Sequence, residues 1–282
     1  MSEYDPVDPP VALTIAGSDS GGGAGIQADL AAMAAHGVFG TSVVTATTAQ
    51  HTRGVEDVHP LPADHVATQY AAVDGDFEVA AIKTGMLATA DIVETVTESV
   101  SGADAPLVVD PVMVAATGDR LLSPAAEDAY EALIAAATLV TPNADEAAVL
   151  TDEPVETPAD AEAAGRELVA LGADAALVKG GHLDGGSVDE GVVVDTLVRA
   201  GGAGGGETAP TVDRFETPRI DTEATHGSGC ALSSAIAARL ARGEPLREAV
   251  AAAVEGMTEA VRRGYDVGEG PGAVNPTASG GE

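Results

Sequence analysis

Aromatic residues, cysteine and long apolar runs are scarce in this sequence of 282 residues. It has no tryptophan, three phenylalanines and four tyrosines, so its 45% of hydrophobic residues are mostly small and aliphatic. The only cysteine is Cys230, which excludes an internal disulfide. No uncharged apolar run reaches the ~18 residues of a membrane span, and residues 1–10 are acidic and proline-rich, unlike a secretory signal. These absences predict a cytoplasmic protein without a membrane partner.

Basic residues are also scarce, since 13 Lys and Arg stand against 45 Asp and Glu and give a formal charge of −32. A surface this acidic repels nucleic acid, which excludes that class of partner. Either a dedicated basic partner or a high-salt cytoplasm explains the acidity. The acidic residues are scattered along the chain rather than gathered in a tail, which favours salt adaptation, because molar salt confines self-repulsion to ~3 Å.

Lysine is the rarest basic residue, and its two positions are Lys83 and Lys179. Each follows an apolar, strand-like run and precedes a turn that contains glycine. A chain that otherwise uses arginine has kept these two lysines either for a function or by chance.

Short apolar runs alternate with longer alanine-rich segments, which predicts an α/β fold with a mostly parallel sheet and helices on both faces. The predicted strands are Val11–Ala16, Ser42–Ala46, Val79–Ile82, Leu107–Val109, Thr138–Val140 and Ala175–Val178. The predicted helices are Gly25–His36, Asp64–Val73, Ala90–Val100, Pro124–Ala136, Pro158–Leu171, Ala231–Arg242 and Leu246–Arg263. Two further runs, Val192–Val198 and Thr211–Thr217, predict a hairpin around the glycine-rich Ala200–Gly206. No repeat is present, so we expect an acidic lead (1–10), one domain (11–275) and a flexible tail (276–282).

A glycine-rich segment, Gly17–Gly25, follows the first strand directly. Ligands bind where strands lead into helices in such folds, and Asp19 offers an acceptor for an amine or hydroxyl. Residues 23–28 fit a dinucleotide fingerprint, but they begin seven positions after the last residue of the strand and no acidic residue follows about 20 positions on. Neither lysine follows a glycine, which excludes a Walker A loop. A glycine-rich connection without function is the alternative.

Polar residues follow several other predicted strands. Gln50 carries an amide that can pair with a ring nitrogen and an amine together. Asp110 ends a strand, where a carboxylate can hold Mg²⁺. Asn143 and Glu146 share one face of a helix start, which fits either a metal and phosphate site or a capping box. Lys179 lies at another strand end, where its charge would meet a phosphate.

The segment Thr225–Cys230 opens an apolar helix. Backbone N–H groups of a glycine turn at a helix amino terminus form an anion site, and the helix dipole adds positive potential. Such a terminus typically lowers the pKa of a thiol, so we expect Cys230 to accept a proton from a substrate hydroxyl. The alternative is that Cys230 only packs the helix start.

Together these segments resemble the hydroxymethylpyrimidine/phosphomethylpyrimidine kinases of thiamine synthesis, within the ribokinase superfamily. The resemblance extends from about Val11 to Asn275 and rests on seven motifs in the family's order: AGSDSGGGAGIQAD, TAQHT, KTGM, DPVM, TPNADEA, VKGGH and THGSGC. Two features depart from the family: Ser228 stands where threonine is commoner, and the loop Ala200–Gly206 looks longer and richer in glycine.

The resemblance implies a ribokinase-like fold and a role for each matching residue. Gly227, Ser228 and Gly229 would stabilise the transferring phosphoryl group, and Cys230 would be the base. Nucleotide and Mg²⁺ would be held by Asn143, Glu146 and Lys179, with Asp110 nearby as a second metal ligand. The pyrimidine pocket would be lined by Asp19, Gln50, Met86 and Val112.

The resemblance also implies the reaction, which is transfer of the ATP γ-phosphoryl group to 4-amino-5-hydroxymethyl-2-methylpyrimidine and then to its monophosphate. Mg²⁺ would be the cofactor and a homodimer the assembly. A pyridoxal or pyridoxine kinase is the nearest alternative, with Gln50 and Met86 as the discriminating residues. A non-catalytic pyrimidine-binding regulator is the alternative from another class, against which the intact phosphate-side residues argue.

Overall fold

The computed structural model describes residues 6–113, 124–181, 191–201 and 209–280, and the side chains of residues 124–128 are not described. The described residues form a nine-stranded sheet of order β3-β2-β1-β4-β5-β6-β7-β8-β9. The strands are β1 Val11–Ser18, β2 Phe39–His51, β3 Gly54–Pro60, β4 Val79–Thr84, β5 Leu107–Val109, β6 Leu139–Val140, β7 Ala175–Val178, β8 Val192–Arg199 and β9 Thr211–Pro218. Strands β2, β1, β4, β5, β6 and β7 are parallel, and β3, β8 and β9 join antiparallel at the edges.

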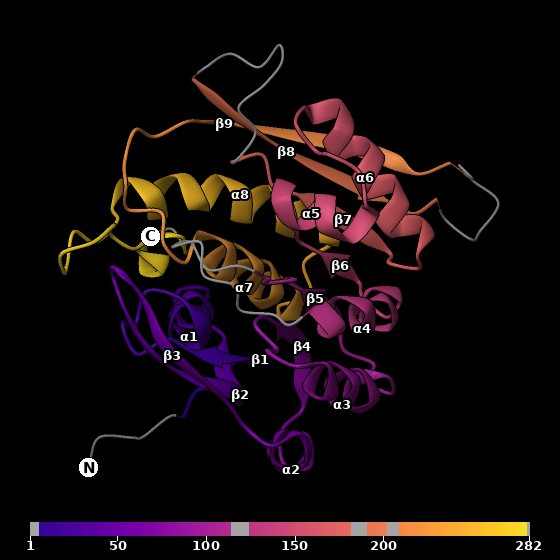
Figure 1. The fold of residues 1–282 in the computed structure, drawn as a ribbon, viewed down its shortest axis with the longest axis vertical. Helices are drawn as coiled ribbons and strands as arrows, with labels where there is room; N and C mark the ends of the chain where they lie inside the picture. The colour runs from indigo at the N-terminus through magenta and orange to yellow at the C-terminus, as the bar shows by residue number, and fades with distance from the viewer. Residues whose placement is uncertain (1–5, 114–123, 182–190, 202–208, 281–282) are drawn as a thin grey trace.

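Helices cover both faces of this sheet (Figure 1). One layer holds α1 Gly25–Ala35, α7 Ser228–Ala241 and α8 Leu246–Arg262, with α7 packed between the other two and against the central strands. The opposite layer holds α2 Ala63–Asp74, α3 Ala90–Val100, α4 Pro124–Ala135, α5 Ala144–Thr151 and α6 Pro158–Ala170. The predicted class, an α/β fold with a mostly parallel sheet between two helical layers, is confirmed.

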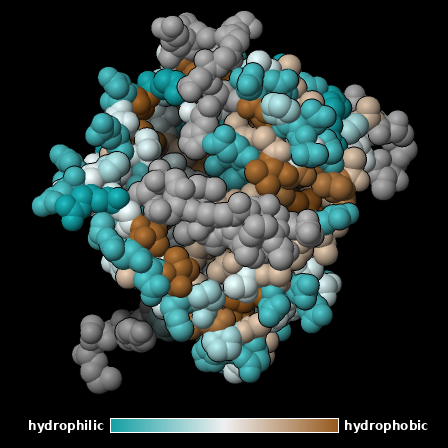
Figure 2. Space-filling view, in the orientation of Figure 1, coloured by the Kyte–Doolittle hydropathy of each residue, from teal (hydrophilic) through white to brown (hydrophobic). Residues whose placement is uncertain are grey.

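The face of the molecule drawn in Figure 2 agrees with the acidic composition. On the face drawn in Figure 2, hydrophilic residues extend around the outline, and hydrophobic residues show as separate patches. Among the described residues, we find no helix that combines the length and the apolar character needed to span a bilayer.

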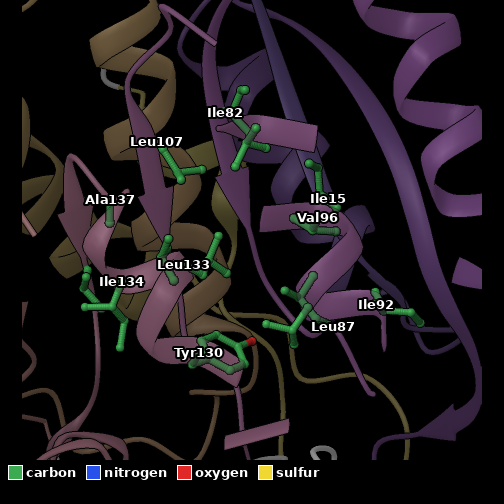
Figure 3. Packing of buried hydrophobic residues seen from close by; sticks show 14 of the residues in the cluster. Ile15, Ile82, Leu87, Ile92, Val96, Leu107, Tyr130, Leu133, Ile134 and Ala137 are labelled. Carbon is green, nitrogen blue, oxygen red and sulfur yellow. The ribbon is translucent and has the colours of Figure 1, made fainter. Parts of the chain in front are cut away.

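The core has two parts because strand side chains alternate between the two faces of the sheet. Ile82, Leu107 and Val109 point into a cluster with α2, α3 and α4, part of which Figure 3 shows around Leu133 of α4. The intervening Ala81 and Val108 point to the other face, where they pack against α7 and α8. Aliphatic residues make up most of both parts, so the scarcity of aromatic residues does not leave the sheet uncovered.

The first edge of the sheet differs from the prediction. Gln50 was expected in a turn, but β2 continues to His51 and pairs antiparallel with β3, a strand that the sequence analysis missed. The reason is that no residue of β3 is buried and its exposed residues are Glu, Asp and His, so it lacks the apolar run by which the buried strands are recognised. The other edge agrees with the prediction, since β8 and β9 form the expected hairpin. Most of its expected glycine-rich loop, residues 202–206, lies outside the described residues.

The end of the chain also differs from the expected flexible tail. Pro276–Ala278 forms a short 3₁₀ helix that packs against α1 and α8. Pro276 and Ser279 are buried, and the backbone N–H of Asn275 donates to the carbonyl of Ala260 in α8. These contacts attach the last turn of the chain to the same helical layer that contains α7.

Candidate active site

A cavity of about 840 Å³ opens at the edge of the sheet where the parallel strands end. This position follows from the topology, because parallel strands bring all their carboxyl ends to one edge. The structure brings every predicted site residue to the wall of this cavity: Asp19, Gln50, Met86, Asp110, Val112, Asn143, Glu146, Lys179, Gly227, Ser228, Gly229 and Cys230.

Asp19 holds the glycine-rich loop in shape. Its Oδ1 accepts the backbone N–H of Gly21 at 2.8 Å, and its Oδ2 accepts those of Gly23 and Ala24 at 3.1 and 2.9 Å. Burial acts to raise the pKa of Asp19, but hydrogen bonds from the His226 ring and these backbone groups outweigh it and lower the pKa. The carboxylate is therefore charged and largely engaged with its own loop, and Oδ1 retains a lone pair for a further donor.

His226 is a site residue to which the sequence analysis gave no role. Its Nε2 lies 3.1 Å from Oδ2 of Asp19 and 3.4 Å from Nε2 of Gln50. The Ser20 hydroxyl donates to the backbone carbonyl of Gln50 at 2.7 Å and accepts the N–H of the same residue. His226 thus joins the loop after β1, the end of β2 and the segment before α7. The sequence signal for His226 is its position in the motif THGSGC, next to the glycine turn.

An apolar wall lies beside these polar groups. Met86 is buried, and its backbone carbonyl accepts the Thr45 hydroxyl at 2.6 Å. A Cβ at Gly17 would lie 2.3 Å from Cε of Met86, so glycine at that position is what admits the methionine to the wall. Val112 packs in the same cluster as Met86. The wall offers a flat, apolar surface next to the Gln50 amide.

Lys179, Asp110 and Glu146 form a lysine–carboxylate cluster at the ends of β7, β5 and β6. Nζ of Lys179 lies 3.1 Å from Oδ1 of Asp110 and 3.8 Å from Oε2 of Glu146. Burial acts to lower the pKa of Lys179, but the two carboxylates outweigh it and raise the pKa, so the ammonium is charged. Burial, aided by Asp110 and opposed by Lys179, raises the pKa of Glu146 to about 7.

Asn143 and Glu146 form the capping box that was one of the two readings. The Asn143 side chain accepts the Glu146 N–H at 2.8 Å, and Oε2 of Glu146 accepts the Asn143 N–H at 2.8 Å. The same glutamate faces Lys179, so the cap fixes its carboxylate in the cavity wall. Among the described residues no group of three His, Cys, Asp or Glu has metal-site geometry. A divalent ion would have the pair Asp110 and Glu146, and Mg²⁺ commonly takes one or two protein carboxylates and completes its shell with phosphate and water.

The amino terminus of α7 lies directly beside this cluster. Gly227 is its N-cap with φ of 77°, and no described side chain caps the terminus. A Cβ at Gly229 would come within 3.1 Å of the Lys179 Nζ and 3.7 Å of Oδ2 of Asp110. Glycine therefore allows the first turn of α7 and the lysine to approach closely. Uncapped N–H groups and an ammonium together make a site for an anion.

The expectation of a lowered thiol pKa at Cys230 is wrong for this structure. Burial raises the pKa of the Cys230 thiol to about 12, although Lys83 and a hydrogen bond from the Gly25 N–H act to lower it. Loss of hydration outweighs the helix terminus here, because an apolar setting penalises the thiolate. Cys230 is half-buried in the cavity wall and is a neutral thiol in this state.

The far end of the cavity is apolar and was not predicted. The apolar residues there come from α7, α8, the end of β9 and the segment after it, namely Leu232, Val254, Met257, Val261, Pro218 and Ile220. In the sequence the α8 residues are indistinguishable from core positions, since their spacing is that of any helix face packed on a sheet.

Comparisons with known proteins identify the family of this chain. Residues 19–275 match the family model described as phosphomethylpyrimidine kinase. The chain is 47% identical over 271 residues to a hydroxymethylpyrimidine/phosphomethylpyrimidine kinase of Streptomyces coelicolor, covering 96% of this chain and 95% of that protein.

Solved structures of two related kinases have the same fold as this chain. A pyridoxal kinase of Bacillus subtilis in complex with ADP has a TM-score of 0.83 at 34% identity, covering 96% of this chain and 98% of that one. A phosphomethylpyrimidine kinase of Clostridium difficile has a TM-score of 0.74 at 38% identity, covering 89% and 99%. The fold is thus ribokinase-like, as the sequence predicted, and the chain belongs to the phosphomethylpyrimidine kinase family.

Proposed function

We propose that this kinase transfers the γ-phosphoryl group of ATP to 4-amino-5-hydroxymethyl-2-methylpyrimidine, and a second phosphoryl group to the resulting monophosphate, in thiamine synthesis. The observation that carries the proposal is the position of Lys179 between two carboxylates and against the uncapped terminus of α7. Phosphoryl transfer depends mainly on positioning and on neutralising charge, and this arrangement supplies fixed positive groups for both.

The substrate ring fits the end of the cavity formed by Met86, Val112 and Gln50. The apolar wall would take one face of a flat heteroaromatic ring, and the Gln50 amide would bond its edge. Oδ1 of Asp19 would accept the exocyclic amine. The hydroxymethyl arm would then point toward Cys230. The thiol would first release its own proton to solvent, and the thiolate would then take up the proton of the hydroxyl as the oxygen attacks phosphorus. The lysine ammonium and the N–H groups of Gly227–Cys230 would bind the non-bridging oxygens of the phosphoryl group.

The charges of the cavity favour a divalent cation with the nucleotide. Two buried carboxylates, Asp110 and Glu146, face the position of the anionic phosphates, and one lysine does not offset both. These carboxylates would hold Mg²⁺, which would neutralise charge on the phosphate oxygens. The adenine would occupy the apolar end formed by α8 and the segment after β9, because its faces need apolar contacts.

A pyridoxal kinase is the second candidate, and a specific observation favours it. The pyridoxal kinase of B. subtilis has the higher TM-score of the two structures compared, at 0.83 against 0.74. Pyridoxal is also a flat ring with a hydroxymethyl arm. Sequence identity favours the pyrimidine, since it is 47% to the S. coelicolor kinase and 34% to the pyridoxal kinase.

Turnover on the two substrates separates these candidates. With ATP and Mg²⁺, we expect kcat/KM for the hydroxymethylpyrimidine to exceed that for pyridoxal by about tenfold or more, the usual discrimination between differently substituted rings in one pocket. The reverse preference would assign the enzyme to vitamin B6 chemistry. Folded protein that binds nucleotide and phosphorylates neither compound would instead be the regulator.

Replacing the thiol tests the proposed base. We expect Cys230→Ala to lower kcat by roughly 10²- to 10⁴-fold, the usual contribution of a general base, with nucleotide affinity retained. Steady-state kinetics and titration of an ATP analogue measure the two effects, and circular dichroism confirms folding. A variant within threefold of the parent would show that the thiol only packs the helix start.

We also propose that the acidity is an adaptation to high salt. With a formal charge of −32, the folded chain repels itself at low ionic strength, and about 1 M salt shortens the range of that repulsion to ~3 Å. The melting temperature and kcat should therefore rise from 0.1 M to 2 M KCl. Sucrose at equal osmolarity is the control, because it stabilises by exclusion without screening charge. Greatest stability below about 0.1 M KCl would contradict the proposal.

A further inference from the structure

The other lysine of the chain, Lys83, lies fully buried beneath the active site. Its Nζ lies 2.9 Å from both carboxylate oxygens of Asp29, and neither side chain is exposed. The same carboxylate accepts the Thr14 hydroxyl at 2.6 Å and the Ser234 hydroxyl at 2.8 Å. The carboxylate of Asp29, which belongs to α1, thus accepts hydrogen bonds from side chains of β1, β4 and α7.

This network is in register with Cys230. Asp29 lies four residues after Gly25 on α1, and Ser234 lies four residues after Cys230 on α7, so each pair shares one helix face. The Gly25 N–H bonds the Cys230 sulfur, and one turn further along Asp29 bonds Ser234. Helices α1 and α7 are therefore joined by two contacts one turn apart, Gly25 to Cys230 and Asp29 to Ser234. The Lys83 ammonium lies at the second of these contacts.

Lys83 also borders the cavity that contains the thiol. A Cβ at Gly85 would come within 2.7 Å of its Nζ, so the backbone after β4 leaves room for the ammonium. The charged groups that act on the thiol are Lys83 from β4, Asp29 from α1, Asp110 after β5 and Lys179 after β7. Among the side chains, Lys83 acts most strongly on the thiol, and its effect favours the thiolate.

The stability of the fold alone does not explain why the ion pair of Lys83 and Asp29 is buried here. Burying two charges costs free energy of hydration that their attraction often fails to recover, and apolar residues of similar volume frequently stabilise a core equally well. Yet a chain with only two lysines places one of them here, where Arg would not supply a compact ammonium.

We propose that Lys83 is a positioning residue for phosphoryl transfer: its ammonium, fixed by Asp29 at the wall of the cavity that also contains Cys230, stabilises the thiolate that accepts the substrate proton. The inference rests on the proposed role of Cys230. The thiol first releases its proton to solvent. The thiolate then accepts the proton of the substrate hydroxyl, and the freed oxygen pair forms the new bond to phosphorus as the bond to ADP breaks. Lys83 contacts neither reactant, so its effect on rate acts through the thiolate.

Because Cys230 is the only cysteine, its thiolate can be followed by alkylation with iodoacetamide without any turnover. We expect Lys83→Met to slow alkylation by about tenfold or more between pH 8 and 10, the effect of removing an opposite charge close to an ionising group. Its kcat should fall by a similar factor with little change in KM for ATP. Thr14→Val is the matched control, because it removes a hydrogen bond to Asp29 and keeps the ammonium, and its alkylation rate should stay within threefold of the parent.

Lys83→Met leaves Asp29 unpaired and could fold poorly, so the double variant Asp29→Asn/Lys83→Met completes the test. It removes the unpaired charge, and we expect it to fold while alkylation remains slow. A folded double variant that is alkylated within threefold of the parent rate overturns the proposal. If Cys230→Ala keeps full activity while Lys83→Met still slows alkylation, the proposed base is wrong and the effect of Lys83 on the thiol stands.

Discussion

The ammonium of Lys179 lies within 4 Å of the carboxylates of both Asp110 and Glu146, in a wall that is mostly removed from water. Like charges in such a setting repel strongly unless a cation lies between them. The ends of three strands and the start of α5 must therefore keep their relative positions, because a shift of any one would leave a buried charge unpaired. The cluster also holds an ammonium against the first turn of α7, where a transferred phosphate would be bound.

The rest of the fold supplies this geometry. Parallel strands covered on both faces bring the segments after β1, β4, β5, β6 and β7 to one edge, and the two large core clusters hold the helical layers against the sheet. Two glycines then allow backbone and side chains to meet: Gly17 near the end of β1 lies against Met86, and Gly229 in the first turn of α7 lies against Lys179. On the opposite side of the same cavity, Asp19 and His226 connect the substrate end to the segment that opens α7.

The sequence predicted the central sheet and the wall of the site because both have local signals. Buried strands appear as apolar runs, and polar residues at their ends mark the edge where ligands bind. What it could not predict depends on contacts between distant segments. The β3 strand is exposed and polar, the carboxylate of Asp29 meets Ser234 across 205 positions of the chain, and the thiol pKa depends on how deeply α7 is buried. The general rule for helix termini gave the wrong direction for Cys230, since it omits desolvation.

The most direct test of this account is the division of the cavity into a phosphate end and a ring end. Isothermal titration calorimetry of the Lys179→Met variant measures its affinity for a non-hydrolysable ATP analogue and, separately, for hydroxymethylpyrimidine. The two affinities report on the phosphate end and the ring end of the cavity. Loss of a charge-assisted contact predicts nucleotide binding weaker by about tenfold or more, with pyrimidine affinity within threefold of the parent. Unchanged nucleotide affinity, or an equal loss for both ligands, would contradict the assignment of Lys179 to the phosphates.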